Sequence, residues 1–213
     1  MPFAHRRPGV PDILYVMAVP QEYGPHLKAR IAPLMTGVGP VEAGIAVARE
    51  LARLEAADRL PQMIVSLGSA GSRRLPQLEV FQAIAISYRD MDASVLGFER
   101  GETPFLGMPP ILRPGLVVPQ IPQASLATGA SVVSGRAYEA IEADMVDMET
   151  YAVLRAAQSF SLPIVALRGI SDGAEELRQI DDWTRYLHVL DERLAGAVDK
   201  VEKAVAAGTL TTS

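Results

Sequence analysis

Short apolar runs separated by polar or glycine-rich turns recur along the chain. The runs at residues 13–19, 31–35, 63–67, 80–87 and 164–167 have the length and the Val, Ile and Leu content of buried strands. Other segments carry apolar residues at helical spacing. One such stripe follows Pro40 and consists of Val41, Ile45, Ala48, Leu51 and Ala52. Another lies near the last residues and consists of Leu190, Leu194, Val198, Val201 and Val205, with Gly208 as its stop signal.

A third helix is predicted between residues 145 and 160. The sequence Met145 to Thr150 is expected to open it, and its buried positions are Tyr151, Ala152, Leu154, Ala156, Ala157 and Phe160. Strands therefore alternate with helices, which favours an α/β fold: a mostly parallel or mixed central sheet flanked by helices on both faces. A single domain over residues 1–213 is the simplest organisation for this length.

The segment at residues 106–129 is rich in proline. It contains Pro109, Pro110, Pro114, Pro119 and Pro122. Because proline cannot continue an α-helix, no helix is expected here. The segments on either side are too short to be separate domains, and a surface loop is predicted.

Composition and charge narrow the classes of partner. The net charge is −5, and no basic stripe with interleaved aromatic residues is present, so nucleic acid is disfavoured. No apolar run approaches about 18 residues, the length a membrane span needs. The absence of cysteine excludes disulfides and thiolate metal sites and is compatible with a cytoplasmic location. The only histidines, His5, His26 and His188, lie far apart in the sequence, so no metal or other cofactor is expected.

Three carboxylates stand at predicted element ends. Glu22 follows the first strand, Glu149 opens the third predicted helix, and Asp172 follows the strand at 164–167. Ligands of open α/β sheets bind at the carboxyl ends of the strands, so these side chains are expected to face one pocket. A structural alternative exists for two of them. The helix dipole favours any acidic residue at the position of Glu149, and Asp172 would suit the N-cap of a helix over residues 174–177.

Two glycine-rich turns are predicted beside these acids, at residues 36–39 and 68–71. Such turns let backbone N–H groups approach an anion or a sugar. Neither fits the P-loop pattern or the dinucleotide-binding pattern, which disfavours nucleoside triphosphates and NAD. Cleavage of a glycosidic bond, by contrast, requires a base for water, an acid for the leaving group and stabilisation of positive charge on the sugar. Three carboxylates meet that requirement.

With these residues in view, the chain resembles the nucleoside phosphorylase superfamily, and within it the 5′-methylthioadenosine/S-adenosylhomocysteine nucleosidases. The resemblance lies in four blocks, at residues 18–22, 68–71, 88–104 and 134–172. It implies that Glu22 activates the attacking water and that Asp172, oriented by Ser171, protonates the purine at N7. Further residues implied to contact the substrate are Ser69, Ala70 and Gly71 near the ribose and base, Met148 and Glu149 at the ribose hydroxyls, and Tyr138 stacked on the base.

The resemblance also implies a homodimer with the 89–104 loop at its interface, in which Leu96 and Pro104 of a neighbouring subunit line the pocket for the 5′-substituent. It implies a small-molecule nucleoside and water as partners. Because Glu22 stands where phosphorylases of this superfamily carry a basic residue for phosphate, hydrolysis with release of adenine is favoured over phosphorolysis. The segments around 23–36, 106–129 and 139–145 depart from the family pattern. Three alternatives therefore stay open: a different 5′-substituted adenosine, phosphorolysis, and a non-catalytic nucleoside-binding protein.

Overall fold

A central mixed sheet organises the molecule. The structure is a computed structural model that describes residues 12–173 and 179–212. Eight strands of the described residues form the sheet: β1 (Ile13–Met17), β2 (Leu34–Met35), β3 (Met63–Gly71), β4 (Val80–Tyr88), β5 (Ile111–Leu112), β7 (Gln123–Thr128), β8 (Met145–Asp147) and β9 (Ile164–Asp172). β3 pairs in parallel with β1 and with β9, and β4 runs antiparallel to β9. β6 (Leu116–Val117) and β10 (Thr211–Thr212) form a separate antiparallel pair.

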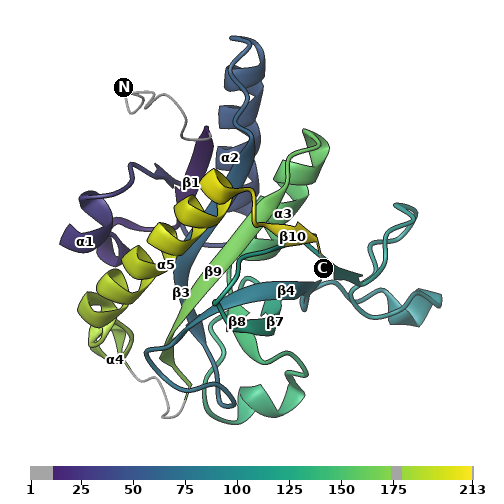
Figure 1. Cartoon of the computed structure of the whole chain (residues 1–213). Helices are drawn as coiled ribbons and strands as arrows, with labels where there is room; N and C mark the ends of the chain where they lie inside the picture. Colours follow the sequence, from purple (N-terminus) through teal and green to yellow (C-terminus); the bar gives the residue numbers. More distant parts are fainter. Residues whose placement is uncertain (1–11, 174–178, 213) are drawn as a thin grey trace.

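Helices cover both faces of this sheet. α2 (Pro40–Glu55) and α3 (Thr150–Ser159) pack against each other on one face. α1 (Pro25–Lys28) and the long α5 (Leu187–Ala207) pack together on the other, where α5 crosses β3 and β9 (Figure 1). The strand period of two separates the two cores: Ile164 and Ala166 of β9 belong to the first, and Val165 and Leu167 belong to the second. The predicted α/β class is therefore confirmed.

The helix after Pro40 buries a face that matches the predicted one only in part, at Leu51. Its buried residues are Ala43, Val47, Leu51 and Leu54, whereas Val41 is 67% and Ile45 50% exposed. Gly44 faces α3, where an added Cβ would be in ordinary van der Waals contact with the Ala152 Cβ at 3.8 Å. The packing of α2 against α3 decides which of its residues are buried, although the larger apolar residues gave the stronger sequence pattern.

Several strands differ from their predicted bounds. β3 and β9 continue past Leu67 and Leu167 to Gly71 and Asp172, so residues 68–71 are strand rather than turn. The extension is held by the last four of the eight residue pairs between β3 and β9, from Gly68 with Arg168 to Gly71 with Asp172. Only Leu34–Met35 of the 31–35 run is strand, as β2.

Two further corrections concern the second half of the chain. Residues 145–147 form strand β8 instead of opening a helix, and α3 begins at Thr150. The proline-rich segment is not a loop throughout, because β7 follows its last proline and buries Ala124, Leu126 and Ala127. The predicted end of the last helix at Gly208 is confirmed by its left-handed backbone, with φ of 65°. The helix predicted over residues 174–177 lies outside the described residues.

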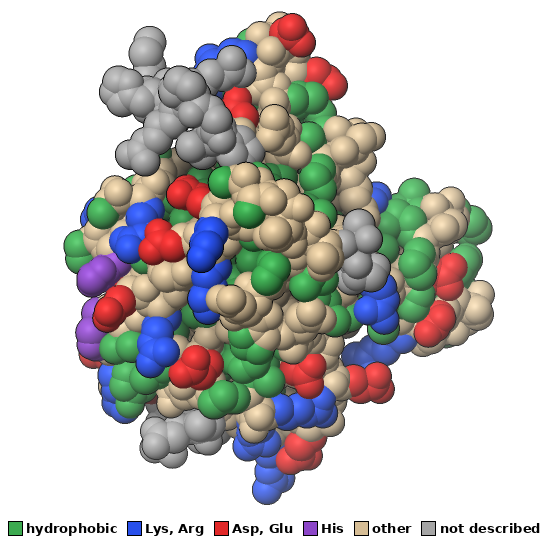
Figure 2. All heavy atoms as spheres, in the orientation of Figure 1, with side chains coloured by type: hydrophobic (Ala, Val, Ile, Leu, Met, Phe, Trp, Pro, Cys, Tyr) green, Lys and Arg blue, Asp and Glu red, His purple; other side chains and the backbone are tan. Residues whose placement is uncertain are grey.

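The segment between β4 and β5, residues 89–110, projects from the rest of the molecule (Figure 1). Hydrophobic side chains cover much of this projection in Figure 2. Those exposed by more than half are Val95, Leu96, Phe105 and Leu106. On the remainder of the face shown in Figure 2, acidic and basic side chains are interspersed. No helix among the described residues has the length and apolar character to cross a membrane.

Candidate active site

A pocket of about 480 Å³ opens at the carboxyl ends of β1, β3 and β9. All three predicted acids line it, each from a different element. Glu22 belongs to the 3-10 helix η1 (Pro20–Glu22) that follows β1, Asp172 ends β9, and Glu149 precedes α3. Parallel neighbours end at the same edge of a sheet, which is why residues far apart in the sequence meet here.

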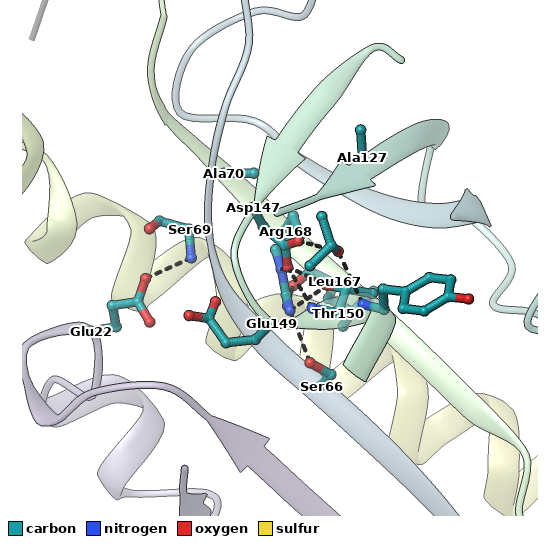
Figure 3. Close-up of polar contacts among 12 residues, drawn as sticks. Glu22, Ser66, Ser69, Ala70, Ala127, Asp147, Glu149, Thr150, Leu167 and Arg168 are labelled. Atoms are coloured by element: carbon teal, nitrogen blue, oxygen red, sulfur yellow. Dashed lines mark hydrogen bonds and ion pairs between the residues drawn. The ribbon is translucent and has the colours of Figure 1, made fainter. Parts of the chain in front are cut away.

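Glu22 is fixed through one oxygen and unpartnered at the other. The Ser69 N–H donates to Glu22 Oε1 at 2.7 Å (Figure 3). Oε2 is buried and has no hydrogen-bond partner among the described residues. Gly68 leaves room for it, since a Cβ there would lie 3.2 Å from Oε2. Burial raises the pKa of Glu22, while the Ser69 hydrogen bonds and Arg168 lower it. The open oxygen is placed to accept a proton from a pocket molecule.

Asp172 is held by its neighbour in sequence. The Ser171 Oγ lies 2.5 Å from Asp172 Oδ1 and donates to it. Burial raises the pKa of the Asp172 carboxyl, and the Ser171 hydrogen bond opposes that shift. A raised pKa is what a carboxyl group needs if it is to act as an acid near neutral pH.

Glu149 is the N-cap residue of α3, and its Oε1 accepts a hydrogen bond from the Gly39 N–H at 2.8 Å. The sequence predicts an ionised Glu149 because the helix N-terminus favours an anion. Burial and the charge of Asp147 nevertheless raise its pKa to about 7, against the lowering by Gly39 and Arg168. The helix terminus is therefore outweighed by desolvation. The Glu149 carboxylate points toward Glu22 (Figure 3), whose charge also raises the Glu149 pKa.

A buried ion pair that sequence reasoning missed lies beside the two glutamates. Arg168 Nε donates to Asp147 Oδ2 at 3.0 Å, and both side chains are almost fully buried. Arg168 Nη2 donates to Ser66 and Thr150, and Thr128 donates to Asp147 Oδ1 at 2.6 Å. Figure 3 shows this network next to Glu149. An arginine inside an otherwise apolar strand was the signal available in the sequence, because buried arginines are nearly always paired.

The other predicted residues divide into two groups. Those on the pocket wall are Ser69, Ala70, Gly71 and Met148. Ser171 acts one step away, through Asp172. The structure does not place Leu96 or Pro104 in the pocket of a single chain; Leu96 lies in the projecting segment and is 73% exposed.

Tyr138 is not among the residues that line the pocket, although its neighbours Val133 and Val146 are, and its stacking on a base stays a prediction. It lies in the 3-10 helix η3 (Gly135–Ala140) and is 8% exposed. Its ring packs in a small cluster with Ala127, Val133 and Val146.

An aromatic residue that sequence analysis did not single out does line the pocket. Trp183, from α4 (Ile180–Thr184), donates its indole N–H to the Ser69 Oγ at 2.9 Å. It is the only tryptophan of the chain and lies in a polar stretch. An aromatic residue in such surroundings is the sequence signal that points to a binding role.

Comparisons with known proteins identify the family of the chain. The family model described as "Phosphorylase superfamily" matches residues 24–201. A 5′-methylthioadenosine/S-adenosylhomocysteine nucleosidase of Exiguobacterium sp. is 23% identical over 196 residues, which is 80% of each chain. The protein of the same name from Staphylococcus aureus is 27% identical over 156 residues, covering 64% of this chain and 66% of the relative. These names agree with the predicted resemblance.

Solved structures share the fold. Futalosine hydrolase of Helicobacter pylori superposes with a TM-score of 0.72 at 19% identity, covering 90% of this chain and 97% of the other. An S-adenosylhomocysteine nucleosidase from Streptococcus pyogenes, solved with 5-methylthiotubericidin, gives a TM-score of 0.73 at 20% identity, covering 91% and 97%. The family model spans most of the sequence and includes Glu149 and Asp172, and this chain belongs to the phosphorylase superfamily.

Proposed function

We propose that the protein hydrolyses the N-glycosidic bond of a purine nucleoside, with a 5′-thio-substituted adenosine such as methylthioadenosine as substrate and adenine as product. The observation that carries the proposal is the meeting of Glu22, Glu149 and Asp172 around one pocket. The relatives of the chain are named as nucleosidases, and these names support an N-glycosyl hydrolase.

Each carboxylate has a distinct chemical role in this proposal. Glu22 Oε2 takes a proton from a water molecule, whose oxygen forms a bond to the ribose C1′ as the bond to the purine N9 breaks. Asp172 delivers its proton to the purine N7, so the base leaves as neutral adenine. Glu149, with Met148, holds the ribose hydroxyls, and its negative charge stabilises the cationic sugar in the transition state.

Hydrolysis is favoured over phosphorolysis by the state of the two pocket arginines. Arg168 is paired with Asp147 and donates to protein oxygens. Arg89 donates to the carbonyl oxygens of Ala127 and Asp147, both at 2.9 Å. Their guanidinium groups are thus engaged by the protein, while the Glu22 carboxylate repels a phosphate anion at the attacking position.

We propose further that a second copy of the chain completes the pocket. The projecting segment exposes Leu96 and Phe105, and α2 exposes Val41 and Ile45. Apolar side chains of this size in groups mark an interaction surface. In a homodimer, Leu96 and Pro104 from the neighbouring subunit would contact the 5′-substituent. Light scattering on the purified protein measures the mass, and a monomer with full activity contradicts this arrangement.

A bulkier 5′-substituent is the second candidate. Trp183 and the 70%-exposed Ile180 extend the apolar wall of the pocket beyond the three acids. The similarity to futalosine hydrolase is in keeping with that candidate. Parallel assays with methylthioadenosine, S-adenosylhomocysteine and futalosine rank the substrates by kcat/KM.

The decisive experiment measures release of the free base by chromatography, with and without inorganic phosphate. Adenine formation from methylthioadenosine at an unchanged rate without phosphate supports the proposal. Strict dependence on phosphate identifies a phosphorylase instead. Binding of the nucleoside with no turnover of any of the three substrates identifies a non-catalytic binding protein.

A further inference from the structure

The Tyr138 hydroxyl is a buried polar group without a structural use. The side chain is 8% exposed, and its hydroxyl has no hydrogen-bond partner among the described residues. A buried hydroxyl left unpaired destabilises the folded protein, so proteins rarely retain one without a function. A phenylalanine at this position would fill the same space without that cost.

This hydroxyl lies beside the proposed acid. A Cβ added to Gly71 would clash with the Tyr138 hydroxyl and lie 2.9 Å from Asp172 Oδ2, so both oxygens occupy the same side of Gly71. Asp172 Oδ1 is already engaged by Ser171, which leaves Oδ2 as the oxygen that faces Tyr138. The absence of a side chain at Gly71 is what permits the approach.

The charged groups around the hydroxyl are few. Asp172 raises the pKa of Tyr138, and burial raises it more strongly. Arg73, which lies over the Tyr138 ring at 5.7 Å from its centroid, and Arg89 lower it. Asp172 itself is acted on by burial and by Ser171. Tyr138 therefore stays protonated across the working pH range and can only donate its proton in a hydrogen bond to a carboxylate.

We propose that Tyr138 is a positioning residue for Asp172, its hydroxyl donating to Asp172 Oδ2 when a purine occupies the pocket. The inference rests on the proposed function, because it assigns Tyr138 a part in the same proton transfer. As Asp172 gives its proton to N7, negative charge grows on its carboxyl group. A donor at Oδ2, together with Ser171 at Oδ1, stabilises that charge more in the transition state than in the ground state.

The test compares Tyr138→Phe with the wild type. The substitution keeps the ring and removes only the hydroxyl, so a packing or stacking residue tolerates it. Loss of a hydrogen bond to a developing charge is expected to lower kcat about 10- to 100-fold with little change in KM. Because the lost bond stabilises the ionised form, the pKa of Asp172 rises, and the alkaline limb of the kcat profile moves to higher pH.

Tyr151→Phe is the matched control. Tyr151 is equally buried, at 7% exposed, but stacks on Tyr88 at 5.1 Å between ring centroids. It should leave the alkaline limb unmoved. Equal kcat and equal pH profiles for Tyr138→Phe and the wild type overturn the inference, as does a loss confined to KM.

A second measurement is independent of turnover. ¹³C NMR of the Asp172 carboxyl, assigned with Asp172→Asn, gives its pKa in the adenine-saturated protein. A higher pKa in Tyr138→Phe than in the wild type supports the inference, and the same pKa overturns it. A wild-type protein that releases no base would contradict the proposed function alone, since the NMR comparison still decides the position of the hydroxyl.

Discussion

Removal of the Asp147 carboxylate tests whether the floor of the pocket depends on one buried ion pair. The Asp147→Ala variant loses the 3.0 Å contact with Arg168 Nε and the 2.6 Å hydrogen bond from Thr128. It also loses the 2.9 Å hydrogen bond from the Thr150 N–H at the start of α3. Arg168, with 3% of its side chain exposed, is then a buried cation without a counter-ion.

The expected cost is large because the remaining charge cannot reach water. Breaking one partner out of a buried pair typically costs about 3–5 kcal/mol of unfolding free energy. For a chain of this size, each kcal/mol corresponds to about 2–4 °C in Tm, so a decrease of about 6–20 °C is expected. The double variant Asp147→Ala/Arg168→Met removes the orphaned charge and should recover part of the loss.

Urea unfolding followed by circular dichroism measures the unfolding free energies of the wild type, the Asp147→Ala and Arg168→Met single variants and the double variant. The matched control is Asp199→Ala, which breaks the exposed pair with Arg30 at 2.8 Å and should change stability far less. A single variant as stable as Asp199→Ala refutes the reasoning. So does a double variant whose loss equals the sum of its two single variants, because that result means the pair is not coupled.

Four further outcomes are expected. Glu22→Gln should abolish turnover yet retain binding of methylthioadenosine by calorimetry; unchanged kcat removes Glu22 from the mechanism. Asp172→Asn should abolish base release in the chromatographic assay, and a rate close to wild type excludes it as the acid. Glu149 has its pKa raised from 4.5 to about 7, so it contributes stability below pH 4.5 that is lost as pH rises to 7. In Glu149→Gln the fall in Tm over that range should be smaller, and an identical fall contradicts the assignment. Asp191 accepts the Leu27 N–H at 3.0 Å and caps α1, so Asp191→Ala should lower unfolding free energy by about 1–2 kcal/mol in urea titrations; no loss excludes a capping role.

The fold class could be predicted from the sequence because a buried strand needs a short apolar run wherever it packs. The first and last residues of the strands could not be predicted in this way. Residues 68–71 have the small side chains of a turn, yet they are strand because β9 lies alongside with hydrogen bonds to offer. The buried face of α2 likewise depends on its packing against α3, a contact between helices far apart in the sequence that no local pattern encodes.

The three acidic residues of the candidate site could be predicted from the sequence, whereas the residues packed around them could not. Glu22, Glu149 and Asp172 each stood at an element end, where a sheet edge collects side chains. The resemblance predicts that Tyr138 stacks on the purine base, but the position of its ring depends on how η3 packs against β8. Asp147 and Arg168 lie 21 positions apart in the sequence, and the local sequence around either residue does not identify the other as its partner.

The buried Arg168 guanidinium acts unequally on the three carboxylates of the pocket. Arg168 lowers the pKa values of Glu22 and Glu149, which draws both toward the ionised state that a base and a cation-stabilising group require. The causes that set the pKa of Asp172 are burial and Ser171, with no contribution from Arg168. The Arg168 guanidinium therefore lowers the pKa of two of the three carboxylates, Glu22 and Glu149, and does not contribute to the pKa of Asp172. Burial raises the pKa of all three carboxyl groups, so we expect the distinction between base and acid to depend on this difference in charged neighbours.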